Sequence, residues 1–89
     1  MAHNAQPDAS YLRIAQLAVT ESRVFSFQAN GKPDEHQLIT NPRTFGVDAE
    51  RLQRAAERFA VQFTEKPSGN VIIQGRADAI AAVVEHAKL

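Results

Sequence analysis

Apolar positions recur along this chain with two periods, and the change of period separates the predicted helices from the predicted strands. The first helical stretch runs from Asp8 to about Thr20, where apolar side chains return every three or four residues. Asp8 follows Pro7 and can accept a hydrogen bond from the free N–H groups of a first helical turn. Residues 1–7 are small and polar and show no period, so we expect a disordered tail there.

Residues 23–29 alternate with period two, which is typical of a strand that buries one of its faces. One set of alternate side chains is expected to face the core, namely Phe25, Phe27 and Ala29. The other set then faces away from the core, namely Val24, Ser26 and Gln28.

A turn and a shorter strand follow this first strand. Asn30-Gly31 supplies the positive φ that a tight hairpin turn needs, and residues 36–40 return as a strand. The Pro-Asp-Glu run at 33–35 is typical of the protection that edge strands carry, which makes 36–40 a poor docking edge.

The second helix has the clearest start signal in the sequence. Asp48 is placed as its N-cap, and Val47 and Leu52 have the spacing of a hydrophobic staple. Its apolar stripe has helical spacing and consists of Leu52, Ala55, Ala56 and Phe59.

A second hairpin and a last helix complete the chain. Val61 and Phe63 alternate with polar residues, a turn follows at 67–70, and 71–74 returns as a strand that ends at Gly75. Residues 77–88 then carry apolar side chains at helical spacing, which predicts a helix.

The order of these elements predicts an α+β fold with one N-terminal helix followed by two ββα units. Two hairpins can merge into one four-stranded antiparallel sheet, and the alternation along the strands indicates that only one face of it is buried. We therefore expect the helices to pack on that face, in a single domain over residues 8–89.

The composition of the chain excludes several functional classes of protein. The 89 residues include 10 Lys and Arg and 10 Asp and Glu, so the net charge is zero, which excludes a strongly basic nucleic-acid binder and an acidic mimic of one. The chain has no Cys, which excludes disulfides and a thiolate nucleophile. No apolar run approaches the ~18 residues of a membrane span, and no secretory signal is present, so we expect a cytoplasmic protein that does not enter a membrane.

Motifs of catalysis and cofactor binding are also missing. The sequence has neither GxGxxG nor GxxxxGK[ST], so it has no standard phosphate cradle, and we expect no enzyme and no cofactor. Asp34-Glu35-His36 brings three metal-type ligands together, but adjacent side chains cannot all aim at one ion. We interpret this run as a solvated turn and expect no metal site.

Arginine dominates the basic residues, and several arginines cluster near the second helix. Arginine is suited to bidentate recognition of phosphate and carboxylate groups. The candidate anion-binding residues are Arg43, Arg51, Arg54, Arg58 and Arg76. A solvated helix flank paired with Glu50 and Glu57 explains the same residues, and the sequence leaves both interpretations open.

The face of the sheet that the helices leave open is the second candidate surface. Besides Val24, the alternation places on it Ser26, Gln28, Gln62, Thr64, Ile72 and Gln74. This set is uncharged and has no aromatic platform on which bases could stack. It therefore suits a protein partner or a self-contact better than a nucleic acid, and plain solvent exposure is the competing interpretation.

Residues 48–89 resemble the second half of a KH domain, which runs helix, strand, variable loop, strand, helix. The resemblance lies in DAERLQRAAERFAVQFT, then EKPSG, then NVIIQGRADAIAAVVEHAKL, and is closest at Val71-x-Ile73-x-Gly75. KH domains clamp about four nucleotides of single-stranded nucleic acid with a GxxG loop. In this chain Thr44-Phe45-Gly46-Val47 stands at that place, with one glycine.

Together these observations favour a small interaction or regulatory module without catalytic activity. It would bind a protein partner or a second copy of itself through the uncharged sheet face or an edge strand. The alternative is a weak single-stranded nucleic-acid binder with a divergent KH-like half, which would use the arginines named above.

Overall fold

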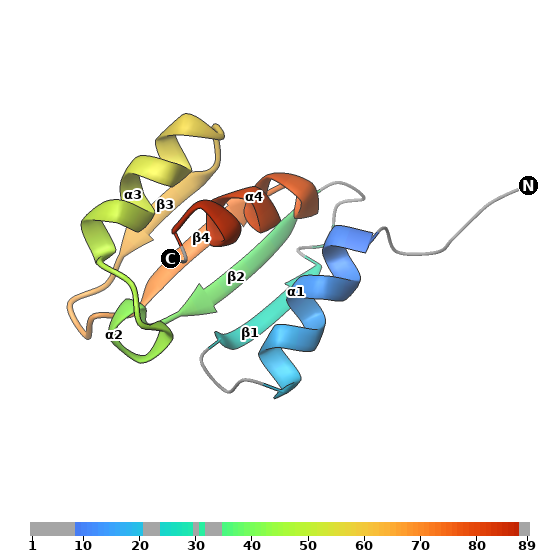
Figure 1. The fold of residues 1–89 in the computed structure, drawn as a ribbon, viewed down its shortest axis with the longest axis horizontal. Helices are drawn as coiled ribbons and strands as arrows, with labels where there is room; N and C mark the ends of the chain where they lie inside the picture. Colours follow the sequence, from blue (N-terminus) through green and yellow to red (C-terminus); the bar gives the residue numbers. More distant parts are fainter. Residues whose placement is uncertain (1–8, 21–23, 30, 32–34, 88–89) are drawn as a thin grey trace, which may run out of the picture.

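The computed structural model describes residues 9–20, 24–29, 31 and 35–87 of the chain, so the tail expected at 1–7 lies outside the described residues. The N-terminal helix, the two hairpins and the helix that follows each hairpin appear in the predicted order, together with one short helix that was not predicted, and this confirms the α+β class (Figure 1). In chain order they are α1 (Ala9–Thr20), β1 (Val24–Ala29), β2 (His36–Thr40), α2 (Pro42–Phe45), α3 (Ala49–Arg58), β3 (Gln62–Glu65), β4 (Val71–Gly75) and α4 (Ala77–Ala87).

The two hairpins merge into one antiparallel sheet in the order β1-β2-β4-β3. The join is the β2–β4 pair, in which Leu38 lies opposite Ile73. β2 is therefore a central strand, and the expectation that residues 33–35 protect an edge at 36–40 was wrong. The edge strands are β1 and β3. Which strand becomes an edge depends on how the two hairpins pair with each other, and the residues that precede a strand do not determine this.

Three helices cover one face of this sheet, and none of the helices in the described residues lies on the other face (Figure 1). α4 lies between α1 and α3, with α1 against β1 and α3 against β3. The core between the layers is built from buried aliphatic side chains, the largest of which are Ile14, Leu38, Leu52, Ile73 and Ile80. Burying one such side chain contributes about 1.5–3 kcal/mol to folding, so this layer supplies most of the stability.

A β-bulge in β1 overturns part of the predicted strand pattern. Val24 pairs with Thr40 and Ser26 pairs with Ile39. Because Thr40 and Ile39 are consecutive, Phe25 is an extra residue of β1 that has no pairing partner on β2. Val24 is consequently buried, at 3% exposed, although it was expected on the open face. Phe25 was expected in the core and is 50% exposed. Beyond the bulge Phe27 packs against the core as expected, whereas Ala29, at the end of β1, is exposed.

The short helix α2 was not predicted, because Asn41-Pro42 was interpreted only as the end of a strand. Pro42 occupies the first turn, where its missing N–H is no loss, and the Asn41 side chain caps the helix by accepting from Arg43 N. Gly46 ends it with a φ of 84°. The N-cap role predicted for Asp48 is confirmed, since its carboxylate accepts from the Glu50 N–H at 3.0 Å.

An ion pair between Arg13 and Glu85 links α1 to α4 on the surface of the helix layer. Within the part of the chain that the structure describes, no helix has the length and apolar character needed to cross a membrane.

The end of α3 contains a backbone conformation that favours glycine. Ala60 has a φ of 58°, and its N–H and that of Val61 bond back to the carbonyls of Glu57 and Ala56. This is a Schellman C-cap with alanine at the position where glycine is usual.

We predict that Ala60→Gly raises the free energy of unfolding by about 0.5–1 kcal/mol, since a left-handed residue with a Cβ costs roughly 1–2 kcal/mol and glycine entropy offsets part of the gain. The matched control is Ala82→Gly inside α4, which should lower stability by about 1 kcal/mol. Urea unfolding of both variants measures the two changes. A loss of stability in Ala60→Gly would contradict the left-handed assignment.

Candidate functional site

The bare face of the sheet presents two complete rows of uncharged side chains. The strand registers place Gln28, Gln37, Gln74 and Gln62 side by side across the four strands, and we call this the glutamine row. The next row, which we call the isoleucine row, contains Ser26, Ile39, Ile72 and Thr64. We call the eight residues together the open face.

Six of the seven residues that the sequence analysis assigned to this surface lie on the open face, and the registers bring them together, whereas the seventh, Val24, is buried. Gln37 and Ile39 were missed because no facing was assigned to residues 36–40. The signal was present, since Gln37 and Ile39 share one parity while Leu38 and Thr40, on the other parity, are buried.

Hydrogen bonds between side chains continue this surface beyond both rows. At one end Gln74 Nε2 donates to Glu35 Oε2 at 2.8 Å. At the other end Asn41 Nδ2 donates to Asn70 Oδ1 at 3.1 Å, across the β2–β4 pair. Both bonds join neighbouring strands, and they orient the side-chain amides of Gln74 and Asn41.

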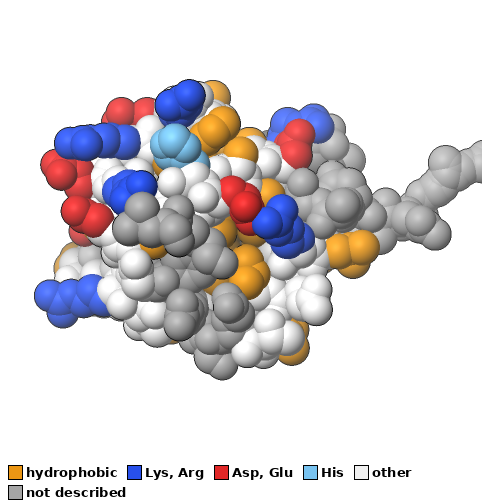
Figure 2. Space-filling view, viewed as in Figure 1, with side chains coloured by type: hydrophobic (Ala, Val, Ile, Leu, Met, Phe, Trp, Pro, Cys, Tyr) orange, Lys and Arg blue, Asp and Glu red, His pale blue; other side chains and the backbone are white. Residues whose placement is uncertain are grey.

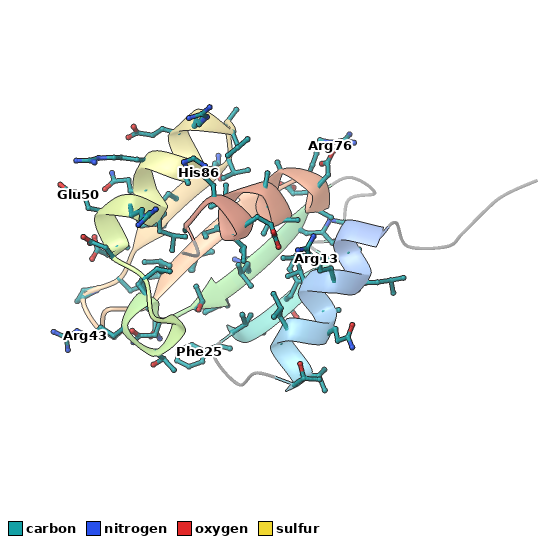
Figure 3. The ribbon with its side chains drawn as sticks, in the orientation of Figure 1. Arg13, Phe25, Arg43, Glu50, Arg76 and His86 are labelled. Atoms are coloured by element: carbon teal, nitrogen blue, oxygen red, sulfur yellow. The ribbon has the colours of Figure 1, made fainter. Side chains whose placement is uncertain are left out.

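Apolar contact area is concentrated at the middle of the open face. Ile39 and Ile72 lie directly opposite each other on the two central strands and remain partly exposed. Phe25 adds a half-exposed aromatic ring at the bulge, near the start of β1 and on the side away from α1 (Figure 3). Bulges commonly re-aim a side chain in this way.

The five candidate anion-binding arginines of the sequence analysis are not gathered into one basic patch. Arg43 and Arg76 lie at opposite ends of the molecule (Figure 3). Arg54 pairs with Glu50 at 3.6 Å, and Arg76 Nε donates to Asp78 at 3.1 Å. Figure 2 shows basic and acidic side chains interspersed over the helix layer. Only Arg51, Arg54 and Arg58 share one exposed helix face, by their spacing on α3.

A groove of about 490 Å³ lies between the start of α3 and the β3–β4 turn. Its lining includes Arg43 together with Asp48 and Glu65. Because the two carboxylates outnumber the one cation, this groove is not a positive site for a phosphate group.

His36 begins β2, as expected for the strand at 36–40, and its ring is partly buried. Its ring stacks on Phe27 at 5.5 Å and meets Tyr11 edge-on at 5.0 Å, on the side of the sheet that the helices cover. Asp34 lies outside the described residues. Among the residues that are described, no three His, Asp or Glu side chains are grouped so as to hold a metal ion.

Comparison with protein-family models, with curated proteins and with solved structures finds no match to this chain.

The hydrogen bond between Arg76 and Asp78 should make the stability of the protein depend on pH. The hydrogen bond from Arg76 lowers the pKa of the Asp78 carboxyl below its usual range, although Asp78 is exposed. A lowered pKa in the folded state stabilises the protein above the unfolded-state value of about 3.9 and is lost as pH falls through the folded-state value. Asp78→Asn should therefore be less stable than the parent at pH 6, and the difference should vanish in acid. Thermal unfolding from pH 6 to pH 2 tests this, and an equal difference at all pH values would contradict it.

Proposed function

We propose that this protein is an interaction module that binds protein through the open face of its sheet. The observation that carries the proposal is the separation of surface types. Charged side chains are interspersed over the helix layer, whereas neither the glutamine row nor the isoleucine row contains a charge. Depletion of charge at the centre of a patch is what distinguishes protein interfaces from the remaining surface.

The arrangement within the face supports the same function. Ile39 and Ile72 would supply a central apolar contact, and Phe25 an aromatic anchor of the kind found among residues that dominate binding energies. The amides around them supply both donors and acceptors, as in the polar rim of an interface. Nothing in the two rows resembles the stacked aromatic platform on which single-stranded nucleic acids bind.

Site-specific photo-cross-linking tests this proposal. A photoreactive amino acid at Thr64, which is exposed on the open face, should give covalent protein adducts in cells. The same group at Gln53, exposed on α3 in the helix layer, is the matched control and should give few. Ile72→Glu should reduce the Thr64 adduct at least ~10-fold, since a carboxylate at the centre of an interface must be desolvated.

A thermal melt of Ile72→Glu is needed beside this experiment, to show that the variant is folded. Equal adducts at Thr64 and Gln53, or an adduct at Thr64 that Ile72→Glu leaves unchanged, would contradict binding at the open face.

A second candidate is weak binding of single-stranded nucleic acid at α3. Arg51, Arg54 and Arg58 share one exposed face of this helix, and α3 begins the segment that resembles a KH domain. Three phosphate contacts would give binding that weakens as salt rises, with a log–log slope near −2 for single strands.

Replacing all three arginines by glutamine tests the second candidate. Fluorescence anisotropy of a labelled single-stranded oligonucleotide should show salt-dependent binding to the parent and a loss of at least ~10-fold in the triple variant. Arg13→Gln, which changes a charge on α1, is the control. Absence of binding by the parent at low salt, or equal binding by parent and triple variant, would exclude this function.

A further inference from the structure

We infer that the partner seated on the open face is a second copy of this chain, related by a two-fold axis that lies between the two sheets and runs along the strands. This inference deepens the proposed function and rests on it. It depends on one property of the face, which is that its rows read almost the same from either edge of the sheet.

The chemistry of each row is symmetric about the line between β2 and β4. The glutamine row is Gln28-Gln37-Gln74-Gln62, and the isoleucine row runs Ser26-Ile39-Ile72-Thr64 from β1 to β3. The same line divides the hydrogen-bonded pair Asn41 and Asn70. Hydroxyl residues therefore lie at both ends of the isoleucine row, with isoleucines on both sides of the centre.

A two-fold axis along the strands converts this internal symmetry into complementarity between copies. The rotation places β1 over β3 of the second copy and β2 over β4, while each row faces its own counterpart. Ile39 then lies over Ile72 of the second copy, and Gln28 over Gln62. Such an interface is isologous, with the same patch on both partners.

Amide side chains suit this arrangement better than charged ones. Each glutamine carries two N–H donors and one carbonyl acceptor, so a glutamine facing a glutamine can satisfy both types of group. The net charge of the chain is zero, so two copies do not repel each other at long range.

The charges that flank the rows also become complementary. Glu35 precedes β2 and Arg76 follows β4, so both lie one step beyond the His36–Gly75 pair, and Arg76 also bonds to Asp78. The rotation brings Glu35 of each copy over the Arg76 position of the other.

The size of the face sets the expected strength of the dimer. Four strands spaced by about 4.8 Å, with about five residues per strand rising about 3.4 Å each, give a face of roughly 19 by 17 Å, or about 330 Å² in projection. Stable specific interfaces bury about 800 Å² per partner. We therefore expect a reversible dimer with a dissociation constant between about 1 μM and about 1 mM.

Paired charge variants test the inference with sedimentation equilibrium of the full chain, from about 10 μM to about 1 mM. The parent should approach twice its monomer mass of 9.8 kDa as concentration rises. Gln28→Glu with Gln62→Glu puts four carboxylates into the interface and should weaken association at least ~10-fold. Gln16→Glu with Gln53→Glu makes the same change of charge on α1 and α3 and should leave association unchanged.

Charge reversal then checks that the same two positions face each other. An equal mixture of the Gln28→Glu, Gln62→Glu variant with a Gln28→Lys, Gln62→Lys variant should form a heterodimer at least as tight as the parent dimer. Association of the parent that both double-glutamate variants leave intact, or a mixture that stays monomeric, would overturn the inference.

The outcomes also separate this inference from the proposed function. A parent that stays monomeric while Thr64 cross-links to a different protein overturns the second-copy partner and leaves the open face as the binding surface. A monomeric parent with no Thr64 adduct overturns both.

Discussion

The pairing of β2 with β4 is the interaction on which the rest of this structure depends. Among the described strands it is the only pairing between the two hairpins, so it fixes how the two ββα units are placed relative to each other. Side chains alternate with period two along a strand, so a slip of one residue in this pair would exchange its buried and open sets. Leu38 would then face water and Ile39 the helix layer. Burial of Leu38 and Ile73 excludes that slip. The same register places Ile39 opposite Ile72 on the open face.

The constraint joins the stability of the fold to its proposed function. The side chains of each strand that face the helices must be apolar, because three helices pack on them. The alternate side chains, which face the open side of the sheet, do not have this requirement. In this chain the open parity is uncharged on all four strands, although charged residues are 22% of the sequence. Charges collect on the helices, where Arg13–Glu85 and Arg54–Glu50 pair across or along them. This division gives the protein a charged, well-solvated side and an uncharged side.

Much of the fold could be predicted from the sequence because local signals agreed with the global arrangement. The Asp48 cap and the stripe of Leu52, Ala55 and Ala56 define α3 without reference to other segments. Alternation identified six residues of the open face for the same reason. The prediction failed where the outcome depends on a partner strand: the bulge at Phe25 and the central position of β2 are properties of a pair, and a single strand does not record them. The short helix α2 was not predicted, because Pro42 can end a strand as well as begin a helical turn.

A concentration series of ¹H–¹⁵N NMR spectra tests, residue by residue, whether two copies of the protein meet through the open face. As the protein is concentrated, amide shifts should move along β2 and β4, above all at Gln37, Ile39, Ile72 and Gln74, while the amides of α3 and α4 stay in place. Shifts that gather on the helix layer instead, with the central strands unchanged, would contradict the account.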